Sequence, residues 1–513
     1  MTYPKPGPFI AMQTLGTESD GNPGARARLW GFTGFLKANV TTIGLALAGI
    51  AVFLFLLAAL CLGACRPKPH SPTVEPTYPF ASPAPSSTAS PSPTVTISST
   101  ATLTPTLAIT LPKIDRYPRA VTMEDWAPWA GQILTTTLKY DPTSLDIWQM
   151  DYRTQDLSQL DLHNSLNDLL LAFFDDRTVW PPANKLPFGF NPQRIMELGR
   201  NPGLGVRSLH DRGITGKGIG IAIIDMPLLV DHQEYSKQLR LYEELYFNGQ
   251  AYQQPAQMHG PQVASIAVGK TEGVAPEADL YYLAVDLASG QDANGNDQFD
   301  FTKAAQAIRR ILEINRQLPS DRKIRVISMS FGWADQFNGY EEISAAVAEA
   351  RAAGVFIICA YPAMDHIYGF MLSGLERSPL ADPDLVTSYS RLHPCDLYAD
   401  NLHLCQAGRL LVPMNSRTTA SPMGQKEYVF YRMGGEGILM PYLAGIYALA
   451  AQVNPEITPE RFWELALQTG GSIDISGTSG VYTLGPILDP VSLIHSLEIS
   501  AESRFRNGLV KGW

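Results

Sequence analysis

The order of elements along the sequence predicts an α/β fold built on a doubly wound parallel sheet. From residue 191 onward, short apolar runs rich in β-branched residues alternate with segments of helical periodicity. Parallel strands buried on both faces have this continuous apolar character. Strands that alternate with helices are typical of parallel sheets joined by crossover helices.

The predicted elements follow one another regularly. The strands are residues 218–225, 278–285, 324–328 and 355–360, and the helices are residues 301–318 and 340–353. In the first helix, Ala304, Ile308 and Ile311 lie on one stripe, as expected for a helix that covers a sheet. Gly354 follows the second helix as a C-terminal glycine. Asp225 ends the first strand, where sites of doubly wound folds lie.

Composition narrows the function before any motif is considered. The chain has 513 residues, 45% of them hydrophobic and 17% charged, with a formal net charge of −10. This length favours more than one structural part. The acidic balance offers no basic face for phosphates, so we expect no nucleic-acid partner. Five cysteines are too few for a disulfide framework that replaces a core.

An uncharged apolar segment, residues 38–65, predicts a membrane anchor. It is long enough to span a bilayer and longer than the apolar part of a cleaved signal peptide. Arg26, Arg28 and Lys37 precede it and favour a cytoplasmic amino terminus. Its end at Cys65 also resembles a bacterial lipobox, with Cys65 as the lipidated residue. A transmembrane helix, a lipoprotein signal and a buried core helix are the alternatives, and the first two place the remaining chain outside the cytoplasm at the cell membrane.

The rest of the chain divides by composition. Residues 1–37 are expected to be a cytoplasmic tail or a removed leader. Residues 66–114 are rich in Ser, Thr and Pro, so they cannot bury enough apolar surface to fold and predict a disordered linker or stalk. Residues 115–190, rich in Trp, Leu and Asp, predict a small N-terminal subdomain, and residues 191–513 form the α/β domain.

Five motifs in this domain, taken in order, resemble those of the subtilisin-like serine peptidases, the subtilases. They are TGKGIGIAIID at 215–225, HGPQVASIA at 259–267, GVAPEA at 273–278, VISMSFG at 326–332 and PYLAG at 441–445. The resemblance covers about residues 195–490. It implies a subtilisin-like fold and the hydrolase activity of a serine-type endopeptidase, a protease.

The resemblance also assigns roles to single residues. Asp225 would hold His259 in the correct tautomer, and His259 would remove the proton of a serine nucleophile. Ser330, Phe331 and Gly332 would line the substrate cleft.

Two departures from the family pattern affect the chemistry. The nucleophilic serine of the family lies four positions before the helix proline, and here that position is Gly437. Glycine has no side chain, so no acyl intermediate can form there. The asparagine that stabilises the oxyanion in the family is replaced by Ala363 in the CAYPA segment. Loss of such a donor typically costs about 10²–10³ in turnover.

Two nearby side chains are alternatives to the missing serine. Ser421 precedes the strand that leads to the glycine-rich segment and would have to fold back over the cleft. Glu436, beside Gly437, either assists hydrolysis by water or is a solvated loop acid.

Metal and disulfide sites are weaker expectations. Asp292, Asn294 and Asn296 offer oxygen ligands for calcium, but they lack EF-hand register, and a polar turn is the alternative. No cofactor is required by the predicted chemistry. Cys395 and Cys405 each follow a histidine by two positions, so a disulfide, a zinc site and free thiols are all open.

The sequence thus leaves three functions. One is a membrane-tethered pseudoprotease that binds a peptide or protein ligand without cutting it. The second is an active serine endopeptidase with a non-standard nucleophile. The third is a structural surface protein, which does not explain why the Asp225 and His259 segments are intact.

Overall fold

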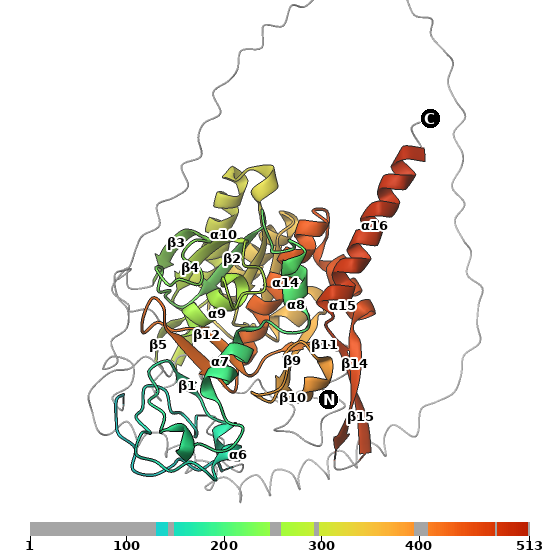
Figure 1. Ribbon diagram of the computed structural model, residues 1–513. Coiled ribbons are helices and arrows are strands. Elements are labelled where there is room, and N and C mark those ends of the chain that lie inside the picture. Colours follow the sequence, from blue (N-terminus) through green and yellow to red (C-terminus); the bar gives the residue numbers. More distant parts are fainter. Residues whose placement is uncertain are drawn as a thin grey trace, which may run out of the picture. The chain divides into compact units, whose positions relative to one another are not determined.

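The computed structural model describes residues 130–141, 148–246, 258–291, 297–393, 409–477 and 480–510 (Figure 1). All of them belong to one compact unit. The predicted anchor and stalk, residues 38–65 and 66–114, lie outside the described residues.

A five-stranded parallel sheet forms the centre of this unit. Its strands lie in the order β3 (Leu239–Leu245), β4 (Asp279–Val285), β2 (Gly220–Asp225), β7 (Ile324–Met329) and β8 (Phe356–Cys359). Every residue of β2 and β4 is buried, because both faces of the sheet are covered. The predicted α/β fold and the four predicted strands are confirmed. The edge strand β3 was not predicted, because charged residues interrupt its apolar pattern.

Two pairs of helices cover the central sheet. Helices α10 (Thr302–Gln317) and α11 (Tyr340–Ala352) contact each other and the strands β2, β4 and β8. Helices α9 (His259–Val268) and α14 (Leu439–Val453) contact each other and the strands β2 and β7. Both predicted helices are confirmed as α10 and α11. Gly354, just after α11, has a φ of 74°, as a C-terminal glycine should.

Helix α14 is apolar along most of its length and almost wholly buried. Within the described part of the chain, residues 436–453 are the one stretch long and apolar enough to cross a membrane. In this structure 83% of that stretch is buried inside the protein. Its apolar character is therefore that of a core helix that contacts strands on one side and helices on the other.

Two further sheets accompany the central one. One has five strands in the order β10 (Tyr389–His393), β9 (Met371–Arg377), β11 (Arg409–Pro413), β15 (Gly480–Ile487) and β14 (Gly471–Gly477). The other has three antiparallel strands, β1 (Phe174–Asp175), β13 (Tyr428–Tyr431) and β12 (Arg417–Ala420). A hairpin of β5 (Ala288–Gln291) and β6 (Asp297–Phe299) completes the described strands.

The remaining helices lie at the ends and connections. They are α6 (Leu166–Leu169), α7 (Pro192–Arg200), α8 (Val206–Asp211), α12 (Ala363–Tyr368), α15 (Pro459–Thr469) and α16 (Pro490–Val510). Short 3₁₀ turns are η1 (Ala183–Lys185), η2 (Ser320–Arg322), η3 (Val386–Ser388) and η5 (Glu436–Ile438).

Residues 148–190 attach to the α/β domain through strand β1. Phe174 of β1 pairs with Phe430 of β13, a residue that is far away in the sequence. Their rings lie 5.0 Å apart and belong to an apolar cluster shared by both segments. The N-terminal segment therefore packs on the same hairpin that precedes η5 and α14.

Candidate active site

The site begins at the carboxyl end of the central strand β2. Asp225 is the last residue of this strand and only 4% exposed. Its neighbours β4 and β7 hold the strand on both sides, which fixes the position of the carboxylate. Its Oδ1 accepts a hydrogen bond of 2.8 Å from the Met226 backbone N–H.

His259 is the first residue of helix α9 and faces this carboxylate. Its Nδ1 donates to Oδ1 of Asp225 over 2.6 Å. The next residue must be small, because a Cβ on Gly260 would come within 2.4 Å of the Pro227 carbonyl oxygen. The glycine therefore lets the start of α9 press against the loop that follows Asp225.

The electrostatics of this pair favour a base held in one orientation. Burial disfavours the imidazolium, but the negative charge of Asp225 and its hydrogen bond outweigh this and raise the pKa of His259. With Nδ1 donating to Asp225, Nε2 is the nitrogen left to accept a proton. This is the arrangement of a general base with an orienting carboxylate.

Buried tyrosines hold the loop after Asp225. The Tyr282 hydroxyl donates to the Met226 carbonyl over 2.5 Å, and the Tyr242 hydroxyl accepts from the Leu228 N–H over 3.2 Å. Burial raises the pKa of both phenols well above the usual value, so both stay protonated. The sequence motifs gave no signal for these two residues, which come from separate strands.

Gly437 lies in η5, the turn that leads into α14, and its residue is buried. Ser330 Oγ donates to the Gly437 carbonyl oxygen over 2.8 Å. The turn η5 contacts α9, the helix that begins with His259. The structure thus brings Asp225, His259, Ser330 and Gly437 together from four distant segments.

The predicted oxyanion residue also lies near this group. Ala363 is the buried first residue of α12, and a cis peptide bond joins Tyr361 to Pro362 just before it. Gly332 packs on this loop so closely that a Cβ there would lie 2.6 Å from the Tyr361 carbonyl oxygen. Residues 360–363 contain no side-chain amide, so none of them can replace the donor of an asparagine.

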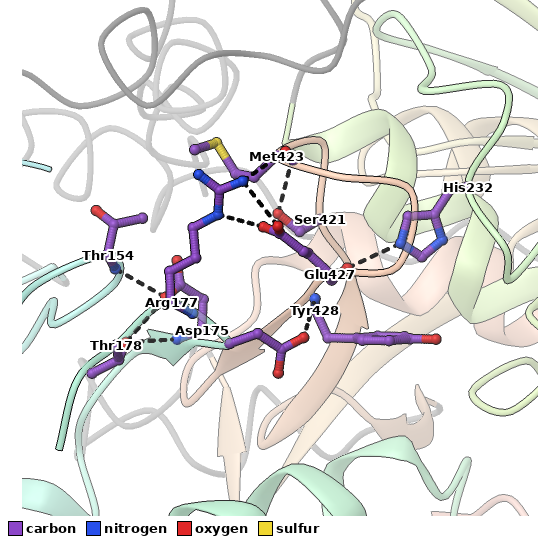
Figure 2. Close-up of polar contacts among 10 residues, drawn as sticks. Thr154, Asp175, Arg177, Thr178, His232, Ser421, Met423, Glu427 and Tyr428 are labelled. Carbon is purple, nitrogen blue, oxygen red and sulfur yellow. Dashed lines mark hydrogen bonds and ion pairs between the residues drawn. The ribbon is translucent and has the colours of Figure 1, made fainter. Parts of the chain in front are cut away.

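Ser421 lies apart from this arrangement. It is 1% exposed, and its Oγ accepts a hydrogen bond from the Met423 N–H over 3.1 Å in the turn between β12 and β13. Figure 2 shows it beside Glu427, whose carbonyl oxygen is bonded at 2.9 Å to His232 Nε2. The Nδ1 of His232 accepts from the Glu234 N–H, so both ring nitrogens are hydrogen-bonded to backbone groups. Ser421 is therefore a turn residue whose neighbouring histidine is already engaged.

A small pocket adjoins Gly437, and the sequence gave no hint of it. Its apolar lining comes from β8, α12, β9 and α14, and its two charged residues are Arg409 and Glu436. Glu436 is half-buried rather than a solvated loop acid, and burial raises its pKa against the opposing charge of Arg409. The lining residues are Cys359, Tyr361, Met364, Phe370, Met371, Leu372, Leu439 and Met440.

Several predicted sites fall where the structure gives no description. Asp292, Asn294, Asn296, Cys395, Cys405 and Cys65 all lie outside the described residues. Among the described residues, no group of three or more His, Cys, Asp or Glu side chains could hold a metal ion. Cys359 is fully buried with a raised thiol pKa, so it behaves as a small apolar core residue.

Comparison with known proteins finds a family match for part of this chain. Residues 216–361 match the model of the subtilase family. The subtilase match contains both Asp225 and His259 and ends at Tyr361, before Gly437.

Two curated relatives are similar at low identity. The Subtilisin-like protease PopC of Myxococcus xanthus (strain DK1622) is 21% identical over 299 residues, 53% of this chain and 60% of that protein. The Serine protease AprX of Bacillus subtilis (strain 168) is 24% identical over 281 residues, 49% of this chain and 61% of that protein. The chain thus spans about three fifths of the length of these subtilase relatives.

Solved structures are similar over about half of the chain. The Prenylagaramide maturation protease PagA matches with a TM-score of 0.38 at 16% identity, over 57% of this chain and 98% of that one. A cold adapted subtilisin-like serine proteinase matches with a TM-score of 0.35 at 16% identity, over 53% of this chain and 89% of that one.

Proposed function

We propose that this chain is a membrane-tethered, extracytoplasmic subtilisin-like peptidase homologue that binds a peptide or protein ligand and is catalytically impaired. The observation that carries the proposal is the position of Gly437, in a buried turn that contacts the helix of His259. The base and its orienting carboxylate are in place at 2.6 Å, but the residue expected to supply the nucleophile has no side chain.

The same geometry supports binding of a peptide ligand in the proposed cleft. In the proposed cleft, Ser330 is bonded to Gly437 of η5, and Gly332 packs against the loop that precedes Ala363. The peptide bond of a ligand bound there would stay uncleaved, because a triad without its nucleophile loses about 10⁶ in turnover. The proposal requires no cofactor, although calcium remains a candidate at Asp292, Asn294 and Asn296, and it includes no nucleic acid.

The location of the protein belongs to the proposal as well. The support is the uncharged segment 38–65, followed by the Ser, Thr and Pro-rich residues 66–114. A Cys65→Ala variant separates the two anchors, because a lipoprotein would lose its acyl label and a spanning helix would not.

The alternative is an active serine endopeptidase with a different nucleophile. The intact pair of Asp225 and His259 favours it. Ser421 is a poor candidate for that nucleophile, because it is buried in a turn, where its Oγ accepts from the Met423 N–H and no described hydrogen bond joins it to a histidine.

The deciding experiment compares the natural full-length chain with its Gly437→Ser variant. Each is treated with a serine-directed fluorophosphonate probe and with unfolded casein. We expect the natural chain to be silent and the variant to be labelled at residue 437. Labelling of the natural chain would overturn the proposal, and mass spectrometry of the labelled peptide would then identify the actual nucleophile.

A further inference from the structure

The small pocket beside Gly437 adjoins the proposed cleft on two sides. One wall is Glu436, the residue that precedes Gly437 in η5. Another is Tyr361, whose carbonyl lies against Gly332 of the proposed cleft. A peptide that lies along residues 330–332 would therefore lie close to this pocket.

Arg409 is the unusual member of the pocket lining. It is half-buried, and its Nε is fully buried without a hydrogen-bond partner in the described part of the chain. No ion pair within 4.0 Å joins Arg409 to Glu436 or to another described carboxylate. A buried donor without an acceptor is costly, and a guanidinium pairs best with a carboxylate through two parallel hydrogen bonds.

The other lining residues make this cation stand out. They include three methionines, a phenylalanine and two leucines, so the pocket wall around Arg409 is mainly apolar. Such a wall excludes water and strengthens any charge pair that forms inside it. Glu436 shares this wall, and burial raises the pKa of its carboxyl against the opposing charge of Arg409, which makes it a weaker competitor for the guanidinium.

We propose that this pocket binds a carboxylate of the peptide ligand, held by the Arg409 guanidinium. The inference rests on the proposed function, because it names the chemical group that the same cleft selects. An acidic side chain and a free carboxyl terminus carry this group equally, so the experiment must separate the two sources.

The test uses fluorescent pentapeptides and the full-length chain, with affinities measured by anisotropy. One matched pair carries Glu or Gln at its central position and an amidated end. A second pair is neutral in its side chains and ends in either a carboxylate or an amide. We expect the carboxylate member of one pair to bind about tenfold more tightly or better, and the responding pair identifies the source.

Variants locate the effect. Arg409→Gln should remove the preference, Arg409→Lys should keep part of it, and Glu436→Gln should leave it in place, because the proposed partner of the carboxylate is Arg409. Arg461→Gln is the matched control, since Arg461 is 46% exposed and paired with Glu464 on the distant helix α15. Thermal melting of each variant confirms that it is folded.

Two outcomes would overturn the inference differently. Equal binding of carboxylate and neutral peptides, or a preference that survives Arg409→Gln and Arg409→Lys alike, would refute the pocket and leave the peptide-binding proposal standing. Absence of binding by every peptide would refute the proposed function together with the pocket.

Discussion

The half of the site that holds Asp225 and His259 differs from the half that holds Gly437 and Ala363. In the first half the side chains of a base and its partner are present and lie 2.6 Å apart. In the second half the Ser330 hydroxyl is bonded to the Gly437 carbonyl, and neither Gly437 nor Ala363 carries a hydroxyl or amide side chain. The contrast teaches that an intact Asp–His pair does not by itself establish a catalytic function, because such a pair can also serve binding or stability.

The largest expected effect tests whether the first half still works as a base. In the Gly437→Ser background, His259→Ala should slow fluorophosphonate labelling by about 10³–10⁴-fold, because the serine loses its proton acceptor. The rate of labelling under excess probe is the measurement, and circular dichroism checks the fold. An unchanged rate would mean that the pair is kept only for packing, and that the two halves no longer cooperate.

The residues of both halves could be located in the sequence because each position follows from a local pattern. Asp225 closes an apolar run, His259 opens a helix, and Gly437 is found by counting back from Pro441. The strands of the central sheet are readable for the same reason, since burial on both faces leaves continuous apolar runs.

Other features escaped prediction because they depend on contacts between distant segments. Strand β1 has two residues and pairs with β13, so nothing near Phe174 in the sequence indicates its partner Phe430. The pocket of Arg409 is likewise assembled from β8, α12, β9, β11, η5 and α14, and no local motif indicates that the buried Nε of Arg409 has no hydrogen-bond partner among the described residues. Contacts between residues far apart in the chain cannot be predicted from the local patterns of a single sequence.

A second prediction concerns a buried acid that follows α9, the helix that begins with His259. Glu272, in the turn that follows α9, is fully buried near Glu234. Burial and the neighbouring charge raise the pKa of Glu272 well above its usual value, despite weaker opposing effects of Ser265, Arg200 and Arg417. Its protonated form is therefore the one compatible with the folded state.

The sign of the resulting pH dependence follows from linkage. A carboxyl whose folded pKa is raised contributes its full stability below its unfolded pKa, about 4.3, and loses it as pH rises through the folded pKa. Glu272→Gln removes this loss, so the variant should gain about 2 kcal/mol over the natural chain at alkaline pH and none near pH 4. Urea unfolding across pH measures the difference, and parallel curves for the two proteins would show that Glu272 does not titrate.

The smallest effect tests how the N-terminal segment is tied to the base half. Arg177 donates to both carboxylate oxygens of Glu427, at 2.5 and 2.9 Å, and to the Met423 carbonyl (Figure 2). The carbonyl oxygen of Glu427 is in turn hydrogen-bonded to His232 Nε2, and His232 lies on the loop after Asp225. The two side chains are about one-third exposed, so we expect a coupling of only about 0.5–1 kcal/mol.

A double-mutant cycle of Arg177→Met and Glu427→Gln measures this coupling by urea unfolding. The exposed pair of Arg461 and Glu464 is the matched control and should give a value nearer zero, because both side chains are about half exposed. Equal couplings would mean that residues 148–190 are held by the apolar contacts of β1 alone. A larger coupling at Arg177 would mean that the N-terminal segment reaches the loop of Asp225 through polar contacts, which would give the retained half of the site a structural partner that the nucleophile half lacks.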